Sequence, residues 1–370
     1  MLRKLALYAI LAGVVPLVLL EVAFRFLPVS YPPHLLPVTP QDPVTRFVPN
    51  VAYRYSTGHD FVIRAQKRTN NFGYNHYADY EPREDSALLM VIGDSFVEAQ
   101  AVDNGKTAAE LLHARVQREG RVYSIGVSGA PLSQYLVFAD YARRTFRPDG
   151  MAFFIIGNDF DESLIKYKSE PRFHYFDERD GAVTLRRLDY ELSAAKKVLR
   201  HSAFLRYVML NLVIERRVEL LVKGERRPDA AAEVDEKRLR DSERAADYFF
   251  ERLPAMSGME PRSIVFVLDA VRPAIYSDAE LEASAGGFHA RLRRYFAAQA
   301  RSRGYEVIDM QPAFIARHRA DGSRFDFPTD SHWNELGHLL VAEELARSQV
   351  FASVFRDRAL VSAGVRRRGP

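Results

Sequence analysis

The sequence predicts an α/β fold in which a parallel sheet of about five strands is covered by helices on both faces. Two observations lead to this prediction. Short unbroken apolar runs recur along the chain, three of them followed by Gly, and such runs are typical of buried parallel strands. Helical stretches separate these runs, which favours right-handed crossovers. The runs assigned to strands cover 87–92, 122–125, 151–156, 263–269 and 305–310.

The segments between these strands supply the helices. We expect helices over 106–119, from Pro131 onward and over 278–302, where apolar residues recur at helical spacing. The alternation breaks between 160 and 260, which we interpret as a helical insertion. Its first helix is expected over 192–222 and its second over 233–253. The basic flanks of the first fit either a helical hairpin packed on the domain or an interfacial helix.

The N-terminus carries a different pattern. Arg3 and Lys4 precede an uncharged run from Leu5 to Leu20, so we expect an N-terminal transmembrane helix over 1–27, with Glu21 paired to Arg25. A cleaved signal peptide is the alternative. Basic residues before the span place the remainder outside the cytoplasm, which predicts a bacterial inner-membrane protein facing the periplasm. The predicted divisions are an anchor over 1–27, a Pro-rich spacer over 28–50, an extended arm or hairpin over 51–86, a domain over 87–355 and a basic tail over 356–370. The turn region of the arm or hairpin is expected at Asn70–Gly73.

Composition excludes several classes of protein. The chain of 370 residues is 47% hydrophobic, which is ample for a packed core. A net charge of +4, without basic runs interleaved with aromatics, does not favour a nucleic-acid partner. The chain has no Cys, which excludes disulfides and thiolate chemistry. Neither a metal-ligand motif nor a phosphate-binding Gly-rich loop is present, so no cofactor is expected.

The first strand leads directly into a candidate nucleophile. Gly93, Asp94 and Ser95 follow the apolar run, and Gly93 allows a sharp turn where the strand stops. Ser95 then lies at the carboxyl end of a central strand, where open α/β sheets bind their ligands. A Ser at this position is either a nucleophile or the cap of the next helix.

Three later blocks favour the nucleophile. The second strand leads to Ser128-Gly129, the third to Gly157-Asn158-Asp159, and Asp330-Ser331-His332 comes near the C-terminus. Ser, Gly, Asn and His in this order resemble the SGNH (GDSL-type) hydrolase superfamily, in particular its membrane-anchored, envelope-facing members. The resemblance covers roughly 87–160 and 262–349. It implies a three-layer, flavodoxin-like domain and an acyl-serine intermediate.

A Ser hydroxyl needs a base, and the base needs an orienting carboxylate. His332 is the candidate base because it lies in a loop before a helix, with an acid two residues earlier. His338 falls inside the closing helix and is expected to be structural. The resemblance assigns Asp330 as the orienting acid. One residue separates this pair instead of the more common two, which leaves Asp326 as an alternative.

The resemblance also assigns an oxyanion hole. Its donors would be the backbone amides of Ser95 and Gly129 and the side-chain amide of Asn158, with Gly126 as a weaker alternative to Gly129. We expect Asp94 and Asp159, which adjoin Gly93 and Gly157, to tie the strand-end loops together.

Trp333 is the only Trp and adjoins the candidate base. It is expected either to wedge the loop into the core or to form a stacking wall for a sugar ring.

The candidate residues and the resemblance together imply an ester hydrolase that acts through an acyl-serine. The predicted location and the resemblance imply that its substrate is an acylated carbohydrate or lipid of the cell envelope. Two alternatives remain open. One is a polysaccharide O-acetyltransferase with the same triad. The other is a non-catalytic scaffold or glycan-binding subunit of an envelope assembly, which the long insertion would favour.

Overall fold

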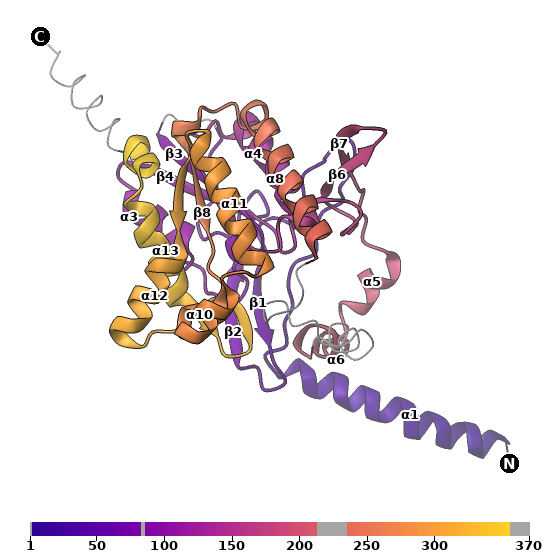
Figure 1. The fold of residues 1–370 in the computed structure, drawn as a ribbon. Helices are drawn as coiled ribbons and strands as arrows, with labels where there is room; N and C mark the ends of the chain where they lie inside the picture. Colours follow the sequence, from indigo (N-terminus) through magenta and orange to yellow (C-terminus); the bar gives the residue numbers. More distant parts are fainter. Residues whose placement is uncertain (1, 83–85, 213–234, 356–370) are drawn as a thin grey trace, which may run out of the picture.

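The computed structural model describes residues 2–82, 86–212 and 235–355. Its centre is a five-stranded sheet in the order β4-β3-β5-β8-β9, with every neighbouring pair parallel (Figure 1). This confirms the predicted α/β fold and its parallel sheet. The strands are β3 (Ala87–Gly93), β4 (Gly120–Gly126), β5 (Gly150–Ile155), β8 (Ile264–Leu268) and β9 (Glu306–Asp309).

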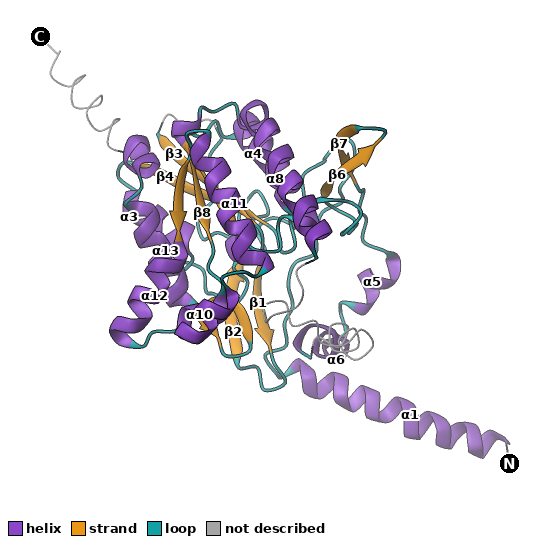
Figure 2. Cartoon of the chain, viewed as in Figure 1, coloured by secondary structure: helices purple, strands orange, loops and turns teal. Residues whose placement is uncertain are grey.

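The apolar runs form strands because both of their faces are covered. Every residue of β3, β4, β5 and β8 is buried, whereas the edge strand β9 is only half-buried. One face of the sheet, which includes Met90 of β3, packs against α4, α8 and α11, and the other face, which includes Val91 of β3, packs against α3, α12 and α13 (Figure 2). The first set is α4 (Leu132–Thr145), α8 (Glu236–Ser257) and α11 (Phe288–Ser302). The second set is α3 (Ala108–Val116), α12 (Met310–Asp321) and α13 (Glu335–Ala346).

The helix predicted over 278–302 is divided in two. The segment forms α10 (Asp278–Ser284) and α11, with Gly286 and Gly287 between them. Gly is unfavourable in a helix interior, and this adjacent pair supplies the break.

Helix α1 (Leu2–Arg25) projects from the body of the molecule (Figure 1). Within the described part of the chain, we find no helix that is long and apolar enough to cross a membrane, so the transmembrane anchor predicted over 1–27 is not confirmed. The predicted pair between Glu21 and Arg25 is present, at 2.9 Å. Glu21 also accepts hydrogen bonds from the Ser202 hydroxyl (2.7 Å) and the Ala203 amide (3.1 Å), which ties α1 to α6 (Ala203–Arg206).

The Pro-rich stretch over 28–50 packs onto the domain instead of standing free as a spacer. It folds back on itself, with the Leu36 amide bonded to the Arg46 carbonyl (2.9 Å). Several of its apolar side chains are buried, among them Leu35, Val38, Val44 and Phe47. Proline density predicted an extended backbone, but the apolar residues between the prolines determine where this segment packs.

An antiparallel hairpin follows, formed by β1 (Ala52–Thr57) and β2 (Ile63–Arg68). Its connection is 58–62, with Gly58 at a φ of +87°, and not the Asn70–Gly73 turn region that the sequence favoured. Asn70 instead begins a second tight turn, in which its side-chain oxygen accepts from the amides of Phe72 (2.9 Å) and Tyr74 (3.0 Å).

The insertion is more mixed than predicted. It contains a second hairpin, β6 (His174–Arg179) and β7 (Ala182–Arg187). The helix expected over 192–222 is interrupted in its described part, because Ser202 caps α6 after α5 (Ala194–Leu199) has ended. Residues 213–222 lie outside the described residues, as do 233–234 of the second expected helix and the basic tail over 356–370. That second helix appears as α8, whose Phe249 and Phe250 are buried in the core.

Candidate active site

The candidate site lies at the carboxyl ends of three adjacent strands. β3 leads to Ser95, β4 leads to Gly129 and β5 leads to Asn158. The next strand in the chain after β3, β4, lies on one side of it, and the following strand, β5, lies on its other side. The strand order therefore reverses at β3, which makes this edge a topological switch point. Three of the residues singled out in the sequence therefore lie at one edge of the sheet.

The structure brings Ser95, His332 and Asp330 into one hydrogen-bonded chain. The Ser95 hydroxyl lies 2.8 Å from His332 Nε2, and His332 Nδ1 lies 2.5 Å from Asp330 Oδ1. The same Asp330 oxygen accepts from the His332 backbone amide at 3.0 Å. This second bond bends the short strand β11 (Asp330–Trp333) so that one intervening residue is enough for carboxylate and imidazole to meet.

The surroundings of His332 suit a base. Burial by itself would lower the pKa of His332, but the hydrogen bond and charge of Asp330, together with the charge of Asp94, outweigh it and raise the pKa above its ordinary value. The His332 side chain is 37% exposed, so a small substrate can reach it. The Phe96 ring packs against the imidazole, with 4.8 Å between centroids.

Asp94 holds the candidate nucleophile in place. One of its oxygens accepts from the Phe96 amide (2.9 Å) and caps the short helix α2 (Ser95–Glu98), while the other lies 3.2 Å from Ser95 Oγ. The carboxyl is buried, and this burial raises its pKa to about 6. The Gly93 before it is required because a Cβ there would lie 2.5 Å from Val97.

The oxyanion-hole candidates are held by charged residues of the insertion, which the sequence did not single out. Gly129 has a φ of +80°, and its carbonyl accepts from Lys168 Nζ at 2.8 Å. The Asn158 amide donates to Glu162 (3.3 Å), and Glu162 is paired with Lys168 at 2.5 Å. Glu162 and Lys168 therefore connect two of the three candidate donors. No motif marks them, so sequence reasoning had no signal for them.

The alternative donor Gly126 is a packing residue. A Cβ at this position would lie 2.7 Å from the Glu98 amide and from Val97, so the glycine allows helix α2 to approach strand β4. Glu98 in turn accepts from the Ser128 amide, which fixes the loop that carries Gly129.

Asp159 ties the third strand-end loop together, as expected. Its carboxylate accepts from the Ile156 amide (2.8 Å) and from the Tyr135 hydroxyl (3.0 Å). Burial, and then repulsion from Asp94, raises the pKa of Asp159 well above its ordinary value. A Cβ on neighbouring Gly157 would lie 3.0 Å from the His289 ring, so that loop is also closely packed.

The structure also decides between the open alternatives. Trp333 is only 1% exposed and donates to Asp269 at 2.9 Å, so it belongs to the core and not to a stacking wall.

Asp326 accepts from the Tyr276 hydroxyl, whereas the His332 imidazole is bonded to Asp330. His338 is buried in α13, where its Nδ1 accepts from the Ala108 amide (3.2 Å), and burial lowers its pKa to about 3.

Sequence reasoning missed the residues that anchor the His332 loop. Arg272 donates to both oxygens of Asp269, at 2.8 and 2.6 Å, and to the Ser331 carbonyl at 2.8 Å. With the Trp333 bond, this ion pair ties the loop to the end of β8. Asp269 itself was the available signal in the sequence. It follows the fourth apolar run, just as Asp94 comes at the end of the first.

This arrangement defines a class of protein. A Ser hydroxyl, an imidazole and a carboxylate in line, with candidate oxyanion donors at the adjacent strand ends, are the parts that acyl transfer through a serine requires. Over the described ranges, no three His, Cys, Asp or Glu side chains gather as metal ligands would.

Comparison with known proteins agrees with this class. Residues 226–354, about a third of the chain, match the family described as "SGNH hydrolase-like domain, acetyltransferase AlgX". The matched part contains His332 and Asp330, whereas Ser95, Gly129 and Asn158 precede it. No curated protein matches the chain.

Similar solved structures are remote. A member of the lipolytic G-D-S-L family from Veillonella parvula is 12% identical over 70% of this chain and 96% of its own, with a TM-score of 0.37. The acetyl xylan esterase AlAXEase is 12% identical over 70% and 97%, with a TM-score of 0.40. A lipase/acylhydrolase from Enterococcus faecalis is 11% identical over 71% and 94%, with a TM-score of 0.36.

Residues 226–354 therefore resemble an SGNH hydrolase-like domain, and the site geometry agrees with that match. The match and the geometry together support an SGNH-type ester hydrolase or acetyltransferase.

Proposed function

We propose that the protein is a serine-dependent acyl-ester hydrolase in which Ser95 is the nucleophile, His332 the general base and Asp330 the orienting acid. The observation that carries the proposal is the continuous chain of hydrogen bonds, 2.8 Å from Ser95 to His332 and 2.5 Å from His332 to Asp330. An isolated Ser hydroxyl is a poor nucleophile, and an adjacent base removes that barrier.

The reaction follows from this order of groups. His332 Nε2 takes the hydroxyl proton as Ser95 Oγ attacks the ester carbonyl, and Asp330 stabilises the imidazolium that forms. The developing oxyanion is met by the amides of Ser95, Gly129 and Asn158. His332 then gives its proton to the leaving alcohol, and a water activated by the same imidazole releases the acid from the acyl-serine.

The proposed substrate is an acylated carbohydrate or lipid of the cell envelope, and the proposed location is outside the cytoplasm. The basic Arg3 and Lys4 before an apolar run support this location. A phosphatase reporter fused after Pro370 should then be active and a cytoplasmic reporter inactive. The reverse pattern would exclude an envelope substrate.

A second candidate is transfer of the acyl group to a polysaccharide hydroxyl. The matched family, described as an acetyltransferase, favours it. The two candidates differ only in the acceptor that resolves the acyl-serine. Incubation with an acetyl donor and an oligosaccharide acceptor separates them, because hydrolysis yields acetate alone and transfer yields an acetylated sugar.

The catalytic proposal is tested with Ser95→Ala. This variant should abolish release of p-nitrophenol from p-nitrophenyl acetate and labelling by a fluorophosphonate, without loss of folding. The matched control is Ser331→Ala, which removes an exposed hydroxyl from the His332 loop and should retain both activities. Wild-type turnover in Ser95→Ala would contradict the proposal.

A further inference from the structure

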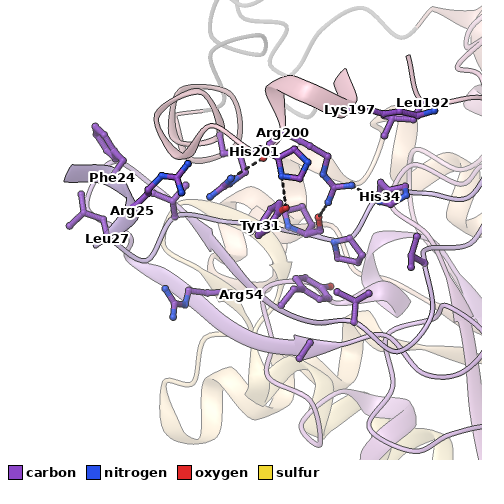
Figure 3. A pocket seen from close by; sticks show the side chains of 18 residues that line it. Phe24, Arg25, Leu27, Tyr31, His34, Arg54, Leu192, Lys197, Arg200 and His201 are labelled. Carbon is purple, nitrogen blue, oxygen red and sulfur yellow. Dashed lines mark hydrogen bonds between the residues drawn. The ribbon is translucent and has the colours of Figure 1, made fainter. Parts of the chain in front are cut away.

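A pocket of about 710 Å³ lies away from the catalytic residues (Figure 3). It is formed by the end of α1, the segment after it, strand β1 and the region of α5 and α6. Neither Ser95 nor His332 lines it, so it is separate from the site described above. Its volume is within the range of small-molecule sites.

The described residues that line this pocket carry charges of one sign. None of them is Asp or Glu, whereas five side chains carry a positive charge: Arg25, Arg54, Lys197, Arg200 and Arg206. Arg25 is paired with Glu21, and Lys197 lies 3.9 Å from Glu191. Of the other three, none forms an ion pair with a residue in the part of the chain that the structure describes.

Two guanidinium groups of this pocket are held by backbone carbonyls and an aromatic ring. Arg200 donates to the Pro32 carbonyl (3.1 Å) and contacts His34 Nδ1. Arg206 donates to the Ser30 carbonyl (3.1 Å) and to the Arg200 carbonyl (2.8 Å). Both lie over the Tyr31 ring, at 5.4 and 4.2 Å from its centroid. Backbone carbonyls and an aromatic ring therefore preorganise two cations that attract an anion.

The local electrostatics agree with an excess of positive charge. Burial lowers the pKa of Arg206, and repulsion from Arg25 and Arg200 adds to this effect, against the opposing influence of Tyr31 and of the Glu21 charge. Burial, with repulsion from Arg200 and Lys197, lowers the pKa of His34. A bound anion would relieve both repulsions.

The rest of the lining is apolar and leads toward α1. Phe24 and Leu27 line the pocket where α1 ends, next to Arg25 (Figure 3). Leu17 and Leu20, one to two turns earlier on α1, are 54% and 38% exposed. An acyl or alkyl chain that leaves the pocket past Phe24 and Leu27 would therefore meet further apolar surface.

We propose that this pocket binds the phosphate group of an anionic amphiphile, with the phosphate between Arg200 and Arg206 and the apolar chain along Phe24 and Leu27. Phosphate oxygens match the forked donors of guanidinium groups. The apolar part of the lining has no role for a phosphate that lacks a chain, and this favours an amphiphile over a free phosphate.

The test uses the full chain, purified in the neutral detergent dodecyl maltoside. Binding of dodecyl phosphate and of inorganic phosphate is followed by ³¹P NMR titration. Dodecyl phosphate should bind saturably, and inorganic phosphate at least about tenfold more weakly, because it lacks the apolar contacts. Equal affinity for the two would overturn the assignment of an amphiphile in favour of a free phosphate.

Two neighbouring lysines of α5 provide a matched pair of variants. Lys197 lines the pocket and Lys196 does not, and both are exposed. Lys197→Glu should weaken dodecyl phosphate binding about tenfold, since it reverses a charge at the site, whereas Lys196→Glu should change it less than about twofold. Arg200→Gln should weaken it at least as much as Lys197→Glu. Equal effects of the two lysine variants would show non-specific attraction and refute the site.

This inference is independent of the catalytic proposal. Ser95→Ala should bind dodecyl phosphate with wild-type affinity, even though it is inactive toward p-nitrophenyl acetate. Loss of binding in Ser95→Ala would contradict the separation of the two sites.

Discussion

Replacement of Asp330 by Asn tests the acid that is proposed to orient the base. Asp330 Oδ1 accepts two hydrogen bonds from His332, one from the backbone amide at 3.0 Å and one at the ring at 2.5 Å. An Asn oxygen can keep both bonds and so preserve the loop, but the negative charge is lost. If the Asn amide turns toward the ring, it donates to Nδ1, and Nε2 can no longer accept the Ser95 proton.

The expected loss follows from these two effects. Removal of the acid from other serine triads costs about 10⁴-fold in turnover. Because the carboxamide oxygen can remain on the His332 backbone, we expect a loss of about 10³- to 10⁴-fold, or roughly 4–5.5 kcal/mol of transition-state stabilisation. The base must be neutral to act, so activity rises with pH through the pKa of His332. Asp330 raises that pKa, and its replacement should therefore move the acidic limb of the profile to lower pH.

The assay is the pH dependence of kcat/KM with p-nitrophenyl acetate. Asp326→Asn is the matched control, because Asp326 lies in the same loop region but bonds to Tyr276. It should keep kcat/KM within a few-fold and leave the acidic limb in place. The reasoning fails if Asp330→Asn loses less than about tenfold, or if Asp326→Asn shows the larger loss.

Two further predictions concern residues that position the site. Lys168→Met removes the bonds to the Gly129 carbonyl and to Glu162. It should lower kcat about tenfold with little change in KM. This loss is smaller than the 10²- to 10³-fold cost of deleting an oxyanion donor, because the donors themselves remain. Lys166→Met is its control, because Lys166 pairs with Glu178 and Asp241, and an equal loss there would refute this role. Trp333→Phe keeps an aromatic ring in the core but loses the bond to Asp269, and should lower stability by about 1–3 kcal/mol in a denaturant titration. An unchanged unfolding midpoint would show that this bond does not stabilise the loop.

Local pattern was sufficient for the central sheet and for the order of the catalytic blocks. Apolar runs such as 87–92 have only one way to bury both faces, between two layers of helices, and a Gly at their end leads into a loop at the carboxyl edge. Ser95, Gly129 and Asn158 are therefore placed at one edge by chain topology alone. His332 could be selected because it lies just before the closing helix with an acid nearby.

Local pattern failed where the placement of a segment depends on pairing with a distant one. The Asn70–Gly73 stretch predicts a turn, but the pairing of Ala52 with Arg68 places the hairpin connection at 58–62. The prolines of the segment 28–50 predict an extended backbone, but they do not determine whether that backbone stands free or packs on the domain. Its burial depends on a domain surface formed by residues far along the chain.

The sequence by itself determined the fold class and selected the candidate nucleophile and the candidate base, because each follows from residues that are close together in the chain or from strand ends that a parallel sheet must align. Only the tertiary structure decided which carboxylate reaches His332, because loop conformation, and not spacing, selects Asp330 over Asp326. It also decided that Trp333 is buried, and that Lys168 connects two candidate oxyanion donors. The cationic pocket depends on tertiary structure entirely, since Arg25, Arg54 and Arg200 come from segments that meet only when the chain is folded.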